Sequence, residues 1–207
     1  MRGQIRDALR ASRADYTEIR LEERESTRVM FRGQDLDTAS AVIDRGGIVR
    51  CLVKSGGWGI ATFNDRKDLP HRVQQAYEGA CAVQAEPVSL APIPASEDTV
   101  AVPLERDFRG VSLTDKRKLT EEYNHILLSF DSRIVDTRTL YVDSFSRVTF
   151  ANSEGAFIEE QRPDVTIFLS AVARQDGKVQ RAFDGLSRVA GFEAVTGGHE
   201  MAEGGAG

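Results

Sequence analysis

Two periods alternate along the chain: the helical spacing of apolar residues and the two-residue alternation of strands. An apolar stripe over residues 2–13 predicts a short helix at the start. Apolar and charged residues alternate over residues 17–21 and again over 27–31, with the charged run 22–25 between them. This alternation is typical of half-buried strands with one wet face, so the first part of the chain is predicted to form an antiparallel meander.

Glycine-containing steps punctuate the strand patterns. Because glycine tolerates positive φ, we expect turns at residues 32–34, 46–47, 55–59, 152–155 and 175–178. Each of these steps lies between segments with apolar alternation. We therefore interpret these glycines as hairpin-turn residues, and no phosphate-binding loop is predicted.

Helical spacing returns at residues 65–85, where Asp68 is a suitable N-cap and Pro70 falls in the first turn. A further helix is expected from near Thr114, which we take as its N-cap. Strand patterns follow this helix, among them the apolar segment 165–173. Helices and strands in this order predict an α+β fold, mainly antiparallel sheet meanders with helices packed on one face.

The prolines suggest a division of the chain. Four of the six prolines lie between Pro87 and Pro103, so this stretch is expected to be extended and irregular. We therefore predict a helix-meander-helix subdomain at 1–85, a proline-rich linker at 86–105, a helix-plus-antiparallel-sheet subdomain at 106–195 and a flexible glycine-rich tail at 196–207.

Composition excludes several classes of protein. The 207 residues carry 27 Lys and Arg against 32 Asp and Glu, a net charge of −5, which disfavours direct binding to nucleic acid. No apolar run is long enough to span a membrane, and the first residues lack the apolar core of a secretory signal. We therefore expect a cytoplasmic protein without membrane contact, in which Cys51 and Cys81 are buried free thiols.

Few residues could carry catalysis. His71 is expected at the surface of its predicted helix, His125 is expected to be packed or half-exposed beside the apolar stripe of the next helix, and the third histidine is His199. His199-Glu200 begins a zinc-binding pattern, but Glu203 and Gly204 stand where a second histidine would be needed. The residues alone therefore predict an α+β domain with no catalytic residue, no metal site and no cofactor of its own.

Several motifs nevertheless occur in an order that resembles a known family. They are Ala14-Asp-Tyr-Thr-Glu-Ile-Arg-Leu-Glu22, Arg45-Gly-Gly-Ile-Val-Arg50, Gly57-Trp-Gly-Ile-Ala61 and Asn152-Ser-Glu-Gly155. Together they resemble the N-terminal part of the TldD/PmbA family, also called modulator of DNA gyrase, and the Asn-Ser-Glu-Gly form is more similar to its TldD side. The positions expected to be structural or to form a substrate-facing wall are Arg45, Gly46, Gly47, Arg50, Gly57, Trp58, Gly59, Asn152, Ser153 and Gly155.

The resemblance implies a zinc metallopeptidase that acts on peptides and unfolded protein segments. The family's H-E-x-x-x-H helix and its later cysteine belong to a C-terminal half that this sequence lacks, so we expect this chain to contribute to the substrate chamber and to assembly and to be inactive alone. It also implies a homodimer, or a heterodimer with a PmbA/TldE-like subunit. The alternatives are a stand-alone peptide-binding or regulatory module and a gyrase-linked regulator that binds nucleic acid, which the acidic charge disfavours.

Overall fold

The computed structural model describes residues 1–54 and 57–197. The helices are separated by strands, several of which are unusually long. In chain order the elements are α1 (Arg2–Arg10), β1 (Tyr16–Arg32), β2 (Asp35–Val53), β3 (Gly57–Phe63), η1 (Arg66–Asp68), α2 (Leu69–Ala82), β4 (Glu97–Val100), η2 (Phe108–Gly110), α3 (Leu113–Phe130), β5 (Ile134–Asn152), β6 (Phe157–Gln175), β7 (Lys178–Arg188) and α4 (Glu193–Thr196).

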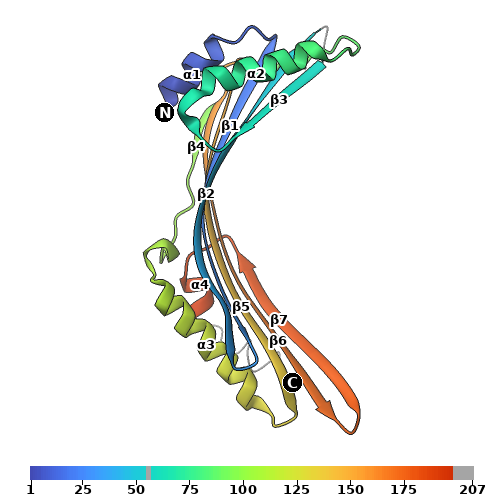
Figure 1. The fold of residues 1–207 in the computed structure, drawn as a ribbon. Coiled ribbons are helices and arrows are strands. Elements are labelled where there is room, and N and C mark those ends of the chain that lie inside the picture. The colour runs from blue at the N-terminus through green and yellow to red at the C-terminus, as the bar shows by residue number, and fades with distance from the viewer. Residues whose placement is uncertain (55–56, 198–207) are drawn as a thin grey trace. The chain divides into compact units, whose positions relative to one another are not determined.

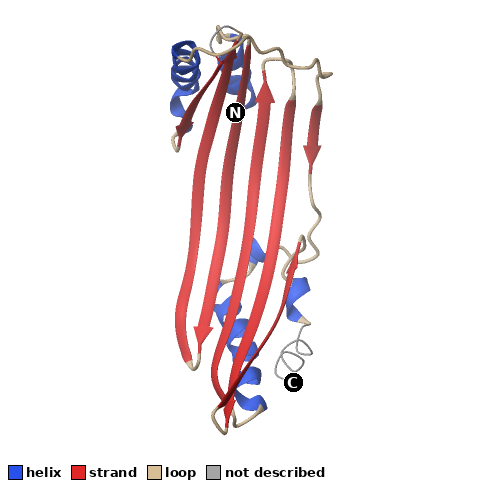
Figure 2. Ribbon diagram, turned by 90° about the vertical axis from the view of Figure 1, so that its right-hand side faces the viewer, coloured by secondary structure: helices blue, strands red, loops and turns tan. Residues whose placement is uncertain are grey.

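The described strands belong to one seven-stranded sheet in the order β3-β2-β1-β5-β6-β4, and β7 also pairs with β6. Figure 2 shows the long strands side by side. β2 pairs antiparallel with β3, and β6 pairs antiparallel with β7, whereas β4 joins β6 in parallel over four residues. The predicted α+β class with a mainly antiparallel sheet is confirmed.

The chain forms two compact units, each drawn from three stretches of sequence. Unit 1 comprises Met1–Arg24, Asp44–Ala101 and Ser146–Gln161, and unit 2 comprises the rest. β1, β2, β5 and β6 are long enough to contribute residues to both units. The contiguous division at the proline-rich stretch stays a prediction, and residues 198–207 of the predicted tail, with the His199-Glu200 pattern, lie outside the described residues.

In unit 1 the helices α1 and α2 cover one face of the strands (Figure 1). Ile5 and Leu9 of α1 and Val73 of α2 are buried against alternate residues of the strands, such as Ile19 and Val49. At β3 the helix comes very close, since a Cβ on Gly59 would lie 2.0 Å from the carbonyl oxygen of Ala76. Only glycine therefore fits beneath α2 at this position.

Unit 2 buries an aromatic core beneath α3 and α4. Its members are Val29, Phe31, Phe108, Tyr123, Leu127, Tyr141, Phe145, Val165, Ile167, Leu169, Phe192 and Val195. The Tyr123 hydroxyl donates a hydrogen bond of 2.7 Å to the carbonyl oxygen of Val195, which ties α3 to α4. In this unit, as in the other, the helices lie on one face of the strands.

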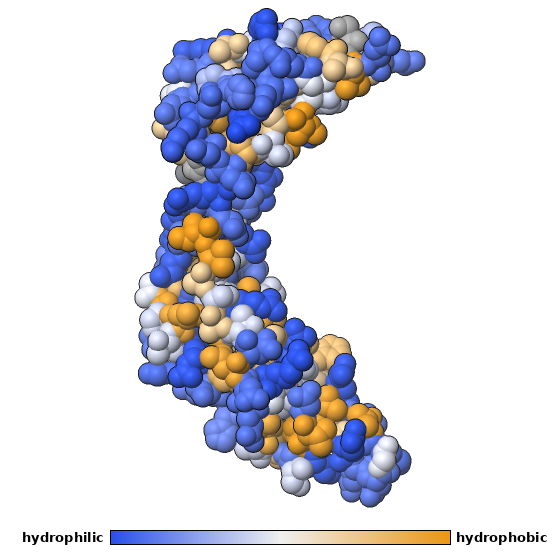
Figure 3. Space-filling view, in the orientation of Figure 1, coloured by the Kyte–Doolittle hydropathy of each residue, from blue (hydrophilic) through white to orange (hydrophobic). Residues whose placement is uncertain are grey.

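Some apolar side chains remain at the surface. Figure 3 shows them interspersed among hydrophilic groups in both units. Ile93 in unit 1 and Phe183 in unit 2 are each 72% exposed. Scattered exposure of this kind is ordinary, so only an apolar residue beside a cavity needs a further explanation. Among the described residues, no helix combines the length and the apolar character that crossing a membrane requires.

Three of the predicted turns are confirmed: Gly33, Gly155 and Gly177 adopt positive φ between consecutive strands. The prediction at Gly46-Gly47 was wrong, because both residues lie inside β2. Gly47 is instead a packing position, where a Cβ would fall 2.4 Å from the Phe63 ring. At the predicted turn 55–59, residues 55 and 56 lie outside the described residues and β3 begins at Gly57.

Two predicted strands proved to be one. β1 runs for 17 residues through the charged run 22–25, because neighbouring strands supply counter-charges. Arg45 of β2 and Arg147 of β5 both reach Glu23, with nitrogen–oxygen distances of 2.6 Å and 3.2 Å. Such cross-strand ion pairs let a charged segment continue as a strand.

The helix ends were predicted in part. Asp68 caps α2 as expected, its side chain accepting from the backbone N–H of His71. α3 begins two residues earlier than predicted, because Ser112 and not Thr114 is its N-cap. The proline-rich stretch contains a short strand, β4, that its composition did not suggest. Cys51 is buried as predicted, whereas Cys81 is exposed, so the prediction for that thiol was wrong.

Candidate functional site

A cavity of about 490 Å³ opens in unit 1 and brings together three of the positions selected from the sequence. These are Arg50 of β2, Trp58 of β3 and Asn152 of β5. Tyr16 and Glu18 of β1 complete the polar side of the cavity. Its apolar side comes from Phe150, Ile158 and the segment 90–96 of the proline-rich stretch.

Strand alternation places this cavity on the face that the helices leave open. Thr17 and Ile19 point toward the core beneath α1 and α2, so Tyr16 and Glu18 point the other way. The same alternation separates Gly59, which contacts α2, from Trp58 on the open face. Tyr16 and Glu18 are nevertheless only 8% exposed each, because the neighbouring side chains cover them.

A polar network forms the base of the cavity. The Arg50 Nε donates to Glu18 Oε1 at 2.5 Å, and a second guanidinium nitrogen of Arg50 pairs with the same oxygen. The Tyr16 hydroxyl donates to the other carboxylate oxygen at 2.8 Å. Both oxygens of Glu18 therefore have a partner, which a carboxylate in so enclosed a position requires.

Aromatic contacts hold the network in place. The rings of Tyr16 and Trp58 meet edge to face, with centroids 5.9 Å apart and an interplanar angle of 78°. The Arg50 guanidinium carbon lies 5.4 Å from the centroid of the Trp58 ring. A cation at this distance from an indole is attracted by the ring, so Trp58 orients Arg50 as well as lining the cavity.

Tyr16 holds its hydroxyl proton firmly. Burial raises the pKa of Tyr16 to about 12, the Glu18 carboxylate adds to the rise, and a long contact of 3.5 Å from Asn152 Nδ2 opposes it. At neutral pH Tyr16 is therefore a neutral phenol whose proton is directed at Glu18. This arrangement is suited to binding a ligand through apolar contacts and hydrogen bonds, and it presents no activated nucleophile.

Asn152 and Ser153 shape the rim through the turn between β5 and β6. The Asn152 Oδ1 accepts from the backbone N–H groups of Glu154 and Ala156, at 3.1 Å and 2.8 Å. Ser153 exchanges two hydrogen bonds with Thr17: its N–H donates to the Thr17 carbonyl, and its Oγ accepts from the Thr17 N–H. These two residues therefore fix the turn against β1.

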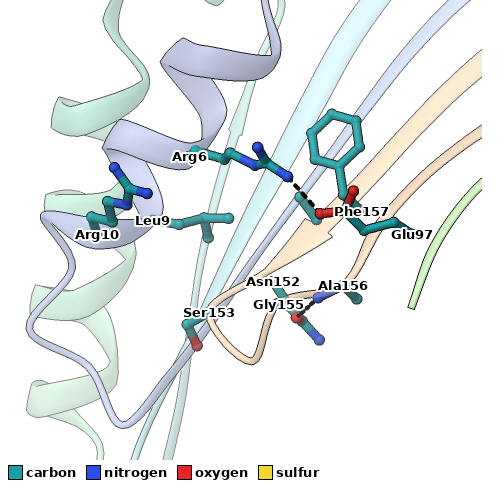
Figure 4. A pocket seen from close by; sticks show the side chains of 10 residues that line it. Arg6, Leu9, Arg10, Glu97, Asn152, Ser153, Gly155, Ala156 and Phe157 are labelled. Atoms are coloured by element: carbon teal, nitrogen blue, oxygen red, sulfur yellow. Dashed lines mark hydrogen bonds and ion pairs between the residues drawn. The ribbon is translucent and has the colours of Figure 1, made fainter. Parts of the chain in front are cut away.

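A second, smaller cavity of about 230 Å³ lies on the other side of this turn and is lined by Ser153 and Gly155 (Figure 4). Figure 4 shows Arg6 of α1 reaching toward Glu97 of β4, where Arg6 Nη2 lies 2.5 Å from Oε1. Arg2 pairs with the same carboxylate and lowers its pKa. Because these charges satisfy one another, we interpret the smaller cavity as the joint between α1 and β4.

The other selected positions lie apart from the larger cavity. Arg45 pairs with Glu23, Gly46 and Gly47 lie within β2, and Gly59 contacts α2. Gly57 opens β3 with φ of 99°, a conformation that favours glycine. His71 is exposed, as expected, whereas His125 is also exposed, so the prediction of a packed or half-exposed position was wrong. Within residues 1–54 and 57–197, no cluster of three His, Cys, Asp or Glu side chains is placed to hold a metal ion.

Sequence reasoning missed Tyr16 and Glu18 as members of the site. It assigned the alternate positions of β1 to a wet face, and for Glu18 that assignment was wrong. Aromatic residues could have revealed the site from the sequence, because Tyr16 and Trp58 both occupy positions that strand alternation assigns to the open face. Two aromatic side chains on the polar face of one sheet, here on strands separated by β2, indicate a site, because solvent-facing strand positions seldom need them.

The fold and the cavity define an α+β protein with a cavity of mixed polar and apolar lining on the open face of its sheet. Two family models match the chain: PmbA/TldA metallopeptidase domain 1 over residues 17–81 and the central domain of the same metallopeptidases over residues 106–203. The chain therefore belongs to the PmbA/TldD family.

Curated relatives carry metalloprotease names. A metalloprotease of Synechocystis sp. is 36% identical over 170 residues, which cover 82% of this chain and 36% of that protein. A metalloprotease of Methanothermobacter thermautotrophicus is 27% identical over 183 residues, which cover 88% of this chain and 39% of that protein. The chain thus spans a little over a third of the length of these relatives.

Solved structures share the fold. A Thermotoga maritima protein named as a modulator of a DNA gyrase superposes with a TM-score of 0.82 over all of this chain and 47% of its own, at 15% identity. TldE from Thermococcus kodakarensis superposes with a TM-score of 0.78 over all of this chain and 46% of its own, at 16% identity.

Proposed function

We propose that this chain is the substrate-binding and assembly portion of a TldD-like zinc metallopeptidase that acts on peptides and unfolded protein segments. The observation that carries the proposal is the family membership, together with relatives named metalloproteases that match over most of this chain. The cavity on the open face of unit 1 supports it, because apolar walls around a few oriented polar groups are typical of ligand-binding sites.

We place the catalytic zinc outside this chain. The resemblance assigns the zinc ligands to an H-E-x-x-x-H helix and a later cysteine in the C-terminal half of the family, and no such motif occurs in these 207 residues. Zinc bound by histidine and cysteine would polarise the scissile carbonyl and supply an activated water. The residues described above would then bind and orient the substrate and carry no step of the hydrolysis.

Extended substrate could add to the sheet at β3. Among the described strands, β3 pairs only with β2, so one of its edges has no strand neighbour. Main-chain hydrogen bonds along such an edge recognise an extended peptide without reading its sequence. Trp58 and Ile60 are 38% and 59% exposed on the open face of this strand, beside the cavity. A peptide added there would bring its alternate side chains toward that face.

The family resemblance extends the proposal to partners and location. We propose that the protein works in the cytoplasm as a homodimer, or as a heterodimer with a PmbA/TldE-like subunit, and that it does not bind nucleic acid directly. The net charge of −5 supports the last point, because a phosphate backbone attracts a basic surface. DNA binding that weakens steeply with salt would contradict it.

The test combines binding and hydrolysis. The 207-residue chain should bind a fluorescent, chemically unfolded polypeptide without cleaving it, with or without added zinc. Hydrogen exchange should then show protection of the β3 amides on binding. Adding a polypeptide that carries the zinc-binding half, alone or with a TldE-like subunit, should start zinc-dependent hydrolysis. Cleavage by this chain alone would contradict the location of the zinc, and the absence of any peptide binding would contradict the substrate-binding role.

A further inference from the structure

The larger cavity in unit 1 has a chemical character that goes beyond a general affinity for peptides. Its apolar contribution is large, from Trp58, Phe150, Ile158 and the exposed Ile93, and its volume of about 490 Å³ is ample for a large side chain. Its charged members are Glu18 and Arg50, which neutralise one another, and Glu154 at the rim. The cavity therefore combines apolar walls with one uncompensated negative charge.

Arg50 retains hydrogen-bonding capacity toward the cavity. A guanidinium has five N–H donors, and two nitrogens of Arg50 are directed at a single oxygen of Glu18. The side chain is 45% exposed and lies against Trp58, so its remaining donors are held in one orientation. A peptide carbonyl is a suitable acceptor for them. A carboxylate suits them less well, because Glu18 and Glu154 would repel it.

Glu154, unlike the paired Glu18, is a carboxylate at the rim of the cavity. It is exposed on the turn between β5 and β6, and its side chain forms no hydrogen bond or ion pair with the described part of the chain. Its backbone N–H is fixed by Asn152 Oδ1 at 3.1 Å, which holds the residue at the rim. A ligand with a positive charge at that point would gain an ion pair without displacing an existing one.

One wall of the cavity is weakly held. Residues 84–95 form no hydrogen bond with any described residue, and the segment is attached to β6 where the Ser96 carbonyl accepts from the Phe157 N–H at 2.8 Å. Leu90 and Ile93 of this segment are 36% and 72% exposed. Few backbone bonds mean a low cost for local displacement, so this wall can adapt to side chains of different shape.

We propose that the cavity selects, within an extended peptide, a large apolar residue that is followed or preceded by a lysine or arginine. The apolar side chain occupies the space between Trp58 and the segment 90–96, the peptide carbonyl accepts from Arg50, and the basic side chain lies beside Glu154. This inference rests on the proposed function and adds to it a preferred substrate class.

The experiment measures binding of three labelled unfolded peptides to the full 207-residue chain by fluorescence anisotropy. The first contains Leu-Lys, the second Leu-Glu and the third Ser-Lys in otherwise identical sequences. Trp58 is the only tryptophan of the chain, so its emission reports occupancy of the cavity independently. We expect the Leu-Lys peptide to bind about tenfold more tightly than the Ser-Lys peptide, because a leucine side chain is transferred out of water.

Matched variants separate the rim charge from net charge. Glu154→Lys should weaken Leu-Lys binding and strengthen Leu-Glu binding, each by about threefold to fivefold. Glu159→Lys makes the same change in net charge at an exposed residue of β6 that alternation places on the other face, and it should leave the preference unchanged. Ile93→Ser should weaken binding of both leucine peptides about threefold, whereas Val88→Ser, in the same segment but outside the cavity lining, should not.

The outcomes distinguish the two proposals. Equal affinity for the three peptides, or equal effects of Glu154→Lys and Glu159→Lys, would overturn the selectivity inference and leave peptide binding intact. Binding that leaves Trp58 emission unchanged would place the peptide elsewhere and would also overturn it. If none of the peptides binds, the substrate-binding role itself fails.

Discussion

A buried ion pair in unit 2 offers the sharpest test of how this chain is stabilised. The Lys116 Nζ lies 2.5 Å from Asp143 Oδ2, and both side chains are only 4% exposed. The Tyr141 hydroxyl donates to the same oxygen at 2.6 Å, and Lys116 also donates to the Thr27 hydroxyl at 3.0 Å. Helix α3 is thereby joined to β5 and β1 through charges that water does not reach.

Removing one partner should be far more damaging than removing both charges. Lys116→Met leaves the Asp143 carboxylate enclosed with only the Tyr141 hydroxyl as a partner. Stranding one member of a buried pair costs about 3–5 kcal/mol of the free energy of unfolding. In the double variant Lys116→Met/Asp143→Asn, the amide oxygen still accepts from Tyr141 and no charge is stranded. We therefore expect the two substitutions to be non-additive by at least about 2 kcal/mol.

Urea denaturation followed by far-ultraviolet circular dichroism measures these changes, and hydrogen exchange of α3 locates them in unit 2. Arg117→Met is the matched control, because Arg117 is the next residue and its pair with Glu121 is exposed, at 3.5 Å. Its loss should change stability by no more than about 0.5 kcal/mol. A Lys116→Met variant as stable as Arg117→Met, or a strictly additive double variant, would refute the reasoning.

Further predictions concern unit 1. Gly59→Ala should destabilise the protein by about 1–3 kcal/mol in urea denaturation, because the added Cβ would lie 2.0 Å from a backbone atom of α2; Gly79→Ala, whose Cβ would meet only an ordinary contact at 3.7 Å, should stabilise it by up to about 1 kcal/mol. In ultraviolet titrations, the difference between the wild type and Tyr16→Phe should show a phenol with pKa about 12; an ordinary value near 10 would contradict its burial. Glu18→Gln should lower the pKa of Tyr16 but leave it raised, because burial is the largest cause. Since the pKa of Tyr16 in the folded state exceeds that in the unfolded state, the stabilisation from neutral Tyr16 should be complete below about pH 10 and lost as pH rises through 12. Comparing the alkaline unfolding of the wild type with that of Tyr16→Phe would check this.

Local signals determined much of the secondary structure. Asp68 and the hairpin glycines Gly33, Gly155 and Gly177 were recognisable because caps and positive φ depend on a few neighbouring residues. The same local rules failed at Gly46-Gly47, where glycine serves close packing inside a strand and not a turn. A pattern along the chain cannot tell these two uses of glycine apart, because the Phe63 ring that requires Gly47 comes from another strand.

Only the tertiary structure decided the site and the continuity of the long strands. The charged run of β1 became strand because Arg45 and Arg147 lie beside it in the sheet, and Lys116 became buried because Asp143 is its partner. The cavity likewise assembles from β1, β2, β3, β5, β6 and the proline-rich stretch. By itself, the sequence determined the α+β class, the turns at Gly33, Gly155 and Gly177, the family resemblance and single residues that line the cavity, such as Arg50, Trp58 and Asn152. Which side chains meet depends on strand order and register, and these are set by contacts between residues far apart in the chain.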